Sequence, residues 1–344
     1  MSQKLKIGVI GVGHMGRNHA RVLSQETMYF DFVGIYDNSE SKASEVANQY
    51  GIKAYRDGNT LLNDVDAVVL AVPSSLHKEM SLMAASKGVH ALVEKPLAPT
   101  VLEAEEIVEA FENEHLKLQV GHIERFNPAY VELKKIVNCN DVFFIEAHRY
   151  SPFNGSGRIT DVGVVEDLMI HDIDLVAGLM SPYDVKTIKA SGESVISNQV
   201  DFSTALINFK TNAHAVINAS RVSQNKERMI NVHMMDSTVN ADLLTRTILI
   251  RKNTDIDIDV HNGNLIKQNG VIQEVFVPST EPLREELVSF YKSCVCDWPI
   301  LCDGKSGLDA VRISDIVTAN IVGRYEGMGE CRYECSVFKS SKAI

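Results

Sequence analysis

The sequence predicts an α/β plus α+β protein of two domains, in which a doubly wound parallel sheet precedes a large, mainly antiparallel open sheet. At 344 residues the chain is longer than one core usually supports. Strand and helix patterns alternate at first, and short segments of alternating polarity dominate later. We expect a first domain over 1–123, a second over 124–325 whose last helix (306–322) can pack back on the first, and a tail over 326–344.

The composition of the chain limits the kinds of partner that the protein is expected to bind. The chain has 34 basic and 45 acidic residues and a formal net charge of −11, whereas nucleic-acid binders usually carry a basic excess. We therefore expect a small-molecule partner and no nucleic acid. No apolar run reaches the roughly 18 residues of a membrane span and no signal-peptide pattern is present, so we expect a cytoplasmic protein without membrane contact. Six cysteines without paired C-x-x-C spacing predict reduced thiols and no metal site.

A glycine-rich turn joins the first predicted strand, Lys6–Gly11, to a helical segment, Arg17–Leu23. Its pattern is G-x-G-x-x-G, in the strand-to-helix context that a dinucleotide site requires. The first glycine makes the tight turn, the second lets a diphosphate approach the backbone, and the third lets helix and strand pack closely. An ordinary strand–helix corner is the alternative. The predicted cofactor residues of this turn are Gly11, Gly13, His14, Met15 and Gly16.

The second predicted strand, Phe32–Asp37, ends in an acid. The Asp37 carboxylate would accept hydrogen bonds from both hydroxyls of the adenosine ribose and would repel a 2′-phosphate. The sequence therefore favours NAD over NADP as the cofactor.

Strand and helix continue to alternate after Asp37. A near-continuous apolar strand, Asp66–Val72, leads into the loop Pro73–His77, at a strand's carboxyl end, where doubly wound sheets bind their ligands. We therefore add Pro73 and His77 to the cofactor candidates. The other elements predicted in this domain are helices at Ser39–Tyr50, through Gly88 and at Leu102–Glu114, and strands at His90–Glu94 and Leu116–Gly121.

The tripeptide Glu94-Lys95-Pro96 ends the strand His90–Glu94. At this edge Lys95 would lie beside the nicotinamide and could polarise a hydroxyl or carbonyl oxygen during hydride transfer. We take Glu94 and Lys95 as cofactor-binding candidates. The alternative for Lys95 is a loop lysine that faces water.

The second domain begins with a predicted helix, strand and Gly/Ser/Pro loop. Hairpins follow, among them Ser203–Phe209 and Ala213–Ala219 around the turn at Lys210. The remaining predicted segments are Asn127–Val137 and Glu166–Leu175 as helices, Asp141–Tyr150 as a strand, Ser151–Gly157 as the loop, and Pro282–Cys294 and Ser306–Val322 as closing helices.

Asp167 and His171 are spaced to lie on one face of a helix, with Asp174 one turn further on the same side. A histidine can take a hydroxyl proton near neutral pH, and a carboxylate one turn away can orient it. The alternative is an ion pair at a helix surface or end. The opposite, apolar stripe consists of Met169, Ile173, Val176 and Met180.

Three arginines, Arg125, Arg149 and Arg158, lie in or near the segment between the domains and could bind a diphosphate or carboxylate. Solvated charges or salt bridges are their alternative. Tyr150 and Asn154 are candidates for contacts with sugar hydroxyls by position.

Together these motifs resemble the Gfo/Idh/MocA family of NAD(P)-dependent sugar and inositol oxidoreductases. The resemblance runs from about residue 5 to about residue 325. The matching segments are Gly11-x-Gly13-x-x-Gly16, Ala71-Val-Pro-x-x-x-His77, Glu94-Lys95-Pro96, Asp167-x-x-x-His171-x-x-Asp174 and Asp303-Gly-x-x-Gly-Leu-x-Ala.

The resemblance implies a Rossmann domain and an antiparallel-sheet domain that binds substrate on its open face and associates into homodimers or homotetramers. It also implies that Lys95, Asp167 and His171 form the catalytic set. Many members have a glycine-rich segment ahead of the catalytic histidine and a further glycine two residues before it. In this chain the corresponding residues are Val162–Glu166 and Met169.

The segments Gly121–Ala129 and Arg149–Leu175 resemble most the UDP-N-acetylglucosamine 3-dehydrogenase branch of the family. This implies that His171 removes the proton of the sugar 3-hydroxyl while Lys95 polarises its oxygen. An inositol or other sugar dehydrogenase is the nearest alternative, and a non-catalytic NAD-binding sensor is the alternative of another class.

Overall fold

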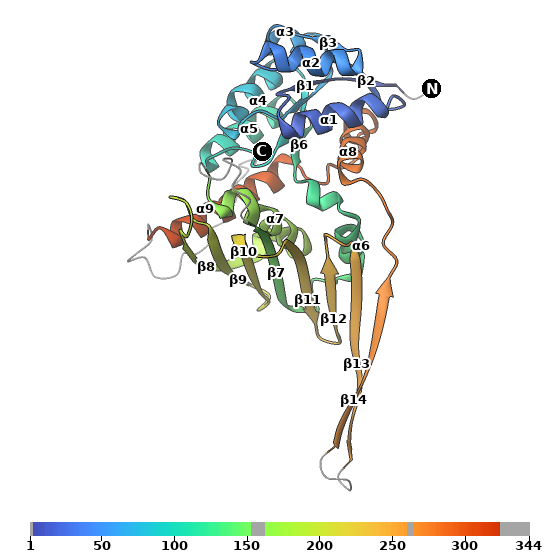
Figure 1. Ribbon diagram of the computed structural model, residues 1–344, viewed down its shortest axis with the longest axis vertical. Helices are drawn as coiled ribbons and strands as arrows, with labels where there is room; N and C mark the ends of the chain where they lie inside the picture. The colour runs from blue at the N-terminus through green and yellow to red at the C-terminus, as the bar shows by residue number, and fades with distance from the viewer. Residues whose placement is uncertain (1–2, 153–161, 260–264, 324–344) are drawn as a thin grey trace, which may run out of the picture. The chain divides into compact units, whose positions relative to one another are not determined.

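The computed structural model describes residues 3–152, 162–259 and 265–323 (Figure 1). The chain divides into two compact units. The first consists of Met1–Glu132 and Val277–Asp315, and the second of Leu133–Phe276 and Ile316–Ile344. The chain therefore leaves the first unit and returns to it near its end.

A six-stranded parallel sheet forms the centre of the first unit, with strand order β3-β2-β1-β4-β5-β6. The order reverses at β1 and β4, which are neighbours in the sheet, and such a switch point is where doubly wound sheets bind ligands. The strands are β1 (Leu5–Ile10), β2 (Phe30–Tyr36), β3 (Lys53–Ala54), β4 (Ala67–Leu70), β5 (His90–Glu94) and β6 (Leu118–Gly121).

Helices cover both faces of this sheet (Figure 1). On one face, buried residues of β4 and β5 pack with α4 (His77–Ser86), α5 (Val101–Asn113) and the first part of α9 (Gly304–Ile321). On the other face, β1 packs with α1, α2 and α8. The remaining helices of this unit are α1 (His14–Gln25), α2 (Glu40–Tyr50), α3 (Gly58–Leu62), α8 (Pro282–Cys296) and the 3-10 turns η1 (Ser74–Leu76) and η2 (Ile123–Phe126), and α6 (Pro128–Ile136) leads into the second unit.

The second unit is built on an eight-stranded sheet with strand order β14-β13-β12-β11-β7-β10-β9-β8. All neighbouring strands are antiparallel except β7 and β10, which are parallel. Figure 1 shows β13 and β14 extending beyond the neighbouring strands as a two-stranded arm. The strands are β7 (Val142–Pro152), β8 (Val185–Glu193), β9 (Phe202–Phe209), β10 (His214–Ser223), β11 (Glu227–Met234), β12 (Ser237–Asp242), β13 (Thr247–Asp259) and β14 (Leu265–Val275).

The described helical segments of this unit are η3 (Val165–Met169), α7 (Ile170–Leu179), η4 (Pro182–Asp184) and the ends of α6 and α9. The pair η3 and α7 contacts the central strands β7 and β10. Alternate residues of these strands, such as Ile145 and Ile217, are buried, as expected for a sheet with one covered face.

The predicted fold class is confirmed, and the unit boundaries differ from the predicted ones. The predicted second domain, 124–325, included α8, which belongs to the first unit. The first part of α9 also belongs to the first unit, in agreement with the expectation that the last helix packs back on the first domain. The apolar faces of α8 and α9, including Leu287, Phe290 and Leu308, are buried against the parallel sheet. In the described part of the chain, no helix has the length and apolar character needed to cross a membrane.

Candidate active site

The three glycines of the turn after β1 have different surroundings. Gly11 has a φ of +89°, and a Cβ there would lie 2.6 Å from the Ala71 carbonyl oxygen. A Cβ on Gly16 would lie 1.8 Å from the Gly11 carbonyl oxygen, whereas a Cβ on Gly13 would meet no atom within 4 Å. Gly11 and Gly16 are thus required by backbone geometry and packing, and Gly13 borders open space in which a ligand can approach the backbone.

The amino end of α1 suits a phosphate. Gly13 is the N-cap residue, and no side chain caps the first amides. These amides and the helix dipole favour an anion. His14 is exposed and Met15 is half-buried. The turn therefore has the open space and the donors that a dinucleotide diphosphate needs.

Asp37 follows β2 and is held beside the glycine turn. One carboxylate oxygen accepts a hydrogen bond from the Val12 backbone amide (2.8 Å), and the other accepts from the Ser39 amide (2.9 Å). Each oxygen retains further acceptor capacity. The carboxylate is thus fixed beside the glycine turn, and the ribose contact of Asp37 stays a prediction.

His77 connects the loops that follow β4 and β5. Its ring is 1% exposed, with Nδ1 2.8 Å from the Pro96 carbonyl oxygen and Nε2 3.0 Å from the Val72 carbonyl oxygen. Burial lowers the pKa of His77, so the ring is neutral at pH 7 and donates to one of these oxygens. Pro73, which directly follows Val72 in the loop after β4, is exposed. The geometry gives His77 a loop-positioning part, since both ring nitrogens face backbone carbonyl oxygens. Its cofactor contact stays a prediction.

Lys95 directly follows β5 and is half-buried. Glu94, the last residue of that strand, is buried. The carboxyl ends of β1, β2, β4 and β5 thus bring the glycine turn, Asp37, the Pro73–His77 loop and Lys95 to one edge of one sheet. We refer to it as the cofactor edge.

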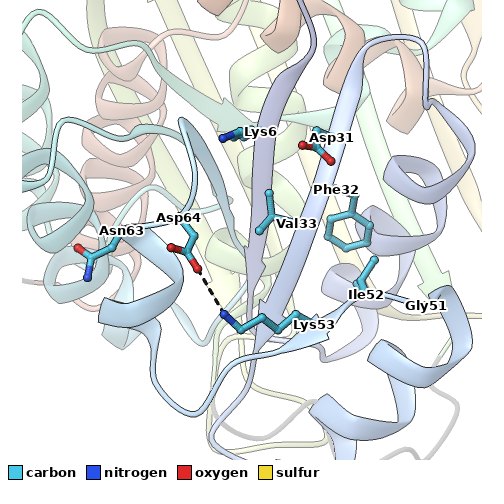
Figure 2. A pocket seen from close by; sticks show the side chains of 9 residues that line it. All are labelled: Lys6, Asp31, Phe32, Val33, Gly51, Ile52, Lys53, Asn63 and Asp64. Atoms are coloured by element: carbon cyan, nitrogen blue, oxygen red, sulfur yellow. Dashed lines mark hydrogen bonds and ion pairs between the residues drawn. The ribbon is translucent and has the colours of Figure 1, made fainter.

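The opposite edge of the sheet also has a hollow, which is shown in Figure 2. Its volume is about 550 Å³, and the ion pair between Lys53 and Asp64 (3.3 Å) lies along it. Its lining comes from the amino ends of β1, β2 and β3 and from the residues before β4, so it is separate from the cofactor edge. The lining residues are Lys6, Asp31, Phe32, Val33, Gly51, Ile52, Lys53, Asn63 and Asp64.

Asp167 lies in a π-helical turn, η3, and His171 lies in the first turn of α7. The Ile170 amide bonds to the Val165 carbonyl oxygen five residues earlier. The expectation of one regular α-helix through both residues is therefore wrong, because the wider turn displaces Asp167 from α-helical phase. Asp167 is exposed and His171 is half-buried. The predicted apolar stripe is confirmed, since Met169, Ile173, Val176 and Met180 are all buried.

Arg149 forms a buried salt bridge with Asp172. A salt bridge was one of the alternatives that the sequence left open for the three arginines. Its Nε donates to Asp172 Oδ2 (3.0 Å) and its Nη2 to Asp172 Oδ1 (2.8 Å). Both side chains are almost fully buried. The bidentate pair fastens α7 to β7, which gives Arg149 a positioning part. Its predicted substrate contact stays a prediction.

The other substrate candidates have different surroundings. Arg125 is buried in η2, in the first unit. Tyr150 is half-buried on β7 and its ring stacks on that of His148, with centroids 5.1 Å apart. Burial, with the charge of Glu227, raises the pKa of Tyr150. Asn154 and Arg158 lie outside the described residues.

The segment that enters η3 is held by residues that sequence reasoning did not single out. Arg221 of β10 pairs with Asp201 (3.0 Å) and donates to the Val162 carbonyl oxygen (2.6 Å). Burial alone would raise the pKa of Asp201, but backbone amides at 195–197 and the Ser197 hydroxyl outweigh it and lower this pKa to about 2. No pattern in the sequence marks this pair, because its partners come together only in the folded sheet.

Comparisons with known proteins agree with this geometry. Residues 5–122 match the family model described as "Oxidoreductase family, NAD-binding Rossmann fold". The chain is 31% identical over 306 residues to the UDP-N-acetylglucosamine 3-dehydrogenase of Acidithiobacillus ferrooxidans, covering 88% of this chain and 93% of that protein. It is 28% identical over 193 residues to an inositol 2-dehydrogenase of Salmonella typhimurium, covering 54% of this chain and 57% of the relative.

Solved structures give the same result. The structure of the A. ferrooxidans UDP-N-acetylglucosamine 3-dehydrogenase GnnA matches with a TM-score of 0.85 and 28% identity, over 93% of this chain and 98% of that chain. A levoglucosan dehydrogenase in complex with NADH and L-sorbose has the same fold, with a TM-score of 0.78 and 18% identity over 93% and 97% of the two chains. One conclusion follows from the family match, the cofactor edge, and the similarity of sequence and structure to the A. ferrooxidans enzyme. The chain belongs to the oxidoreductase family with an NAD-binding Rossmann fold and is an NAD-dependent dehydrogenase.

Proposed function

We propose that this dehydrogenase oxidises a secondary hydroxyl of a sugar to a ketone, and that the substrate is UDP-N-acetylglucosamine, oxidised at its 3-hydroxyl. The observation that carries the proposal is the likeness to the A. ferrooxidans enzyme over 88% of this chain, which includes both units. The cofactor edge supports it, because Lys95 and the glycine turn lie at the same end of one sheet.

In this proposal the cofactor is held by the amino end of α1 and by Asp37. The diphosphate lies on the uncapped amides that begin at Gly13, and the ribose hydroxyls donate to the fixed Asp37 carboxylate. NAD, when bound, accepts a hydride from the sugar carbon. The other residues assigned to this site are Gly11, His14, Met15, Gly16, Pro73, His77, Glu94 and Lys95.

Three residues of the chain act on the sugar. His171 removes the hydroxyl proton, since a neutral imidazole has a suitable pKa at neutral pH. The Lys95 ammonium holds the oxygen and stabilises the negative charge that develops on it as the hydride leaves. Asp167 orients the substrate or the histidine. Arg125 and Tyr150 are the described candidates for contacts with the remainder of the substrate.

A second candidate, inositol, is favoured by the 28% identity to the Salmonella inositol dehydrogenase. Free polyols lack the uridine diphosphate, so the two candidates differ in the need for an anion-binding contact. Activity on myo-inositol without activity on UDP-sugars would select this candidate. NAD binding without turnover of any sugar would select the non-catalytic sensor.

We also propose that the protein is cytoplasmic and associates through the eight-stranded sheet into a homodimer or homotetramer. The supporting observation is that two large apolar side chains of this sheet are exposed near each other, Phe143 of β7 and Met235 in the turn between β11 and β12, which line the same hollow. Large apolar side chains on an open sheet favour association. Light scattering coupled to size exclusion tests this, with a mass of two or four chains expected and a mass near 38.1 kDa contradicting it.

The function is tested by incubating the protein with NAD and one sugar at a time and following NADH formation. UDP-N-acetylglucosamine is expected to react and UDP-glucose and myo-inositol are expected to react poorly. UDP-glucose is the matched control, since it keeps the nucleotide and lacks the N-acetyl group. Equal rates with both UDP-sugars would contradict the proposed substrate but not the dehydrogenase activity.

A further inference from the structure

A cluster of three buried polar side chains in the first unit includes Glu94, the residue that precedes Lys95. It consists of His19 on α1, Glu94 at the end of β5 and Glu286 on α8, and these side chains belong to residues that are 0%, 8% and 0% exposed. Titratable side chains are costly to bury unless they are paired or neutral. Among the three, only Glu94 has a part in the proposed function, at the cofactor site, and its burial together with His19 and Glu286 requires a separate explanation.

The Glu94 carboxylate bonds to two different elements. Its Oε1 lies 2.7 Å from His19 Nε2, and its Oε2 accepts a hydrogen bond from the backbone amide of Lys95 at 3.3 Å. His19 lies three residues after Gly16, in the helix that begins at the glycine turn. One carboxylate therefore connects the helix of the diphosphate site with the backbone of the proposed catalytic lysine.

The surroundings of Glu286 indicate which of the two carboxyl groups, Glu94 or Glu286, carries the negative charge. Neither of its carboxyl oxygens has a hydrogen-bond partner among the described residues. Burial, together with the nearby Glu94 charge, raises the pKa of Glu286 well above its ordinary value. The raised pKa favours the neutral form of Glu286, so the negative charge of the group lies on Glu94, whose oxygens face the His19 ring and the Lys95 amide.

We propose that Glu94 and His19 are positioning residues for Lys95, holding its backbone so that its ammonium meets the sugar oxygen at the cofactor edge. The inference rests on the proposed function of Lys95. Glu94 needs two acceptor oxygens, one for the imidazole and one for the amide, and a glutamine side chain has only one acceptor oxygen. His19 needs a donor at the Nε2 position, which a glutamine at residue 19 can supply and a leucine cannot.

The kinetic test compares four single variants with the wild type. Glu94→Gln and His19→Leu are expected to lower kcat about tenfold or more, because small displacements of a catalytic group are costly, while KM values change less than about threefold. His19→Gln is expected to retain kcat within about threefold, since the donor remains. Glu26→Gln is the matched control, because it removes another carboxylate from the end of α1, where it pairs with Arg284 (2.7 Å).

Two further measurements separate positioning from general stability. In a Lys95→Ala background, Glu94→Gln is expected to cause no additional loss of kcat, since residues that act through one another are non-additive. Amide hydrogen exchange of Lys95, followed by NMR without substrate, is expected to accelerate in Glu94→Gln and His19→Leu and to stay unchanged in Glu26→Gln.

The outcomes distinguish the inference from the proposed function. Faster Lys95 exchange in an enzyme that oxidises no sugar would support the positioning role and refute the function. Unchanged exchange in both Glu94→Gln and His19→Leu would overturn the inference whatever the activity. An additive loss of kcat in the Lys95→Ala background would also overturn it, because Glu94 would then act independently of the lysine.

Discussion

Replacing Glu286 by glutamine tests the charge distribution around Lys95 through stability alone. Glutamine has nearly the same shape and does not titrate. In the unfolded chain Glu286 ionises near its ordinary pKa of 4.5, whereas in the folded protein burial and the neighbouring Glu94 charge raise this pKa. The folded wild type therefore keeps a proton that the unfolded chain releases, over the whole window between the two pKa values.

Proton linkage determines whether the free energy of unfolding rises or falls with pH. Within that window the unfolded state binds fewer protons than the folded state, so the free energy of unfolding of the wild type falls as pH rises, by about 1.4 kcal/mol per pH unit. The glutamine variant lacks this contribution. The difference in unfolding free energy between the variant and the wild type should therefore grow by about 1.4 kcal/mol from pH 5 to pH 6, or about 3–6 °C in Tm for a unit of this size.

Urea unfolding at several pH values measures this difference. Trp298 is the one tryptophan of the sequence and lies in the same unit as Glu286, so its fluorescence reports on the relevant unit. Circular dichroism follows the whole chain in parallel. A difference that stays constant between pH 5 and pH 7 would show that Glu286 ionises as it does in the unfolded chain and would refute the assignment of the charge to Glu94.

Four other predictions concern the framework of the site. Gly13→Ala should weaken NAD binding about tenfold or more while leaving Tm almost unchanged, because its Cβ would enter open space; calorimetric titration and a thermal melt check this. Gly16→Ala should lower Tm, because its Cβ would lie 1.8 Å from the Gly11 carbonyl oxygen. Asp37→Asn should reduce the preference for NAD over NADP, measured as the ratio of kcat/KM values, and an unchanged ratio would contradict the assigned ribose contact. Asp172→Asn should destabilise the second unit by about 3–5 kcal/mol in urea unfolding, because the buried Arg149 guanidinium loses the opposite charge of Asp172.

Local patterns predicted the parallel sheet and the cofactor edge well. The apolar runs that become β1 and β4 and the acid after β2 are signals that each lie within a few consecutive residues. The different needs of Gly11 and Gly13 are also local, since they depend on one turn. Each of these features could therefore be predicted without knowledge of distant contacts.

Features that depend on distant contacts were not predictable in the same way. The apolar face of α8 does not indicate which sheet will bury it, so the boundaries of the first unit differed from the predicted ones. The π turn at Asp167 interrupts a helical pattern whose periodicity continues beyond it. Arg149 and Asp172 are 23 residues apart, and their pairing becomes visible only when β7 and α7 meet. The pairing of His19 with Glu94 has the same origin.

The most direct test of the central claim is NADH formation from NAD and UDP-N-acetylglucosamine by the wild type and by Lys95→Ala and His171→Ala. Turnover by the wild type, and its loss in both variants while NAD still binds, is the predicted result. NAD binding to the wild type without reduction by any of the sugars, even when an aminotransferase and glutamate remove a 3-keto product, would contradict the proposed sugar oxidation and favour the non-catalytic sensor.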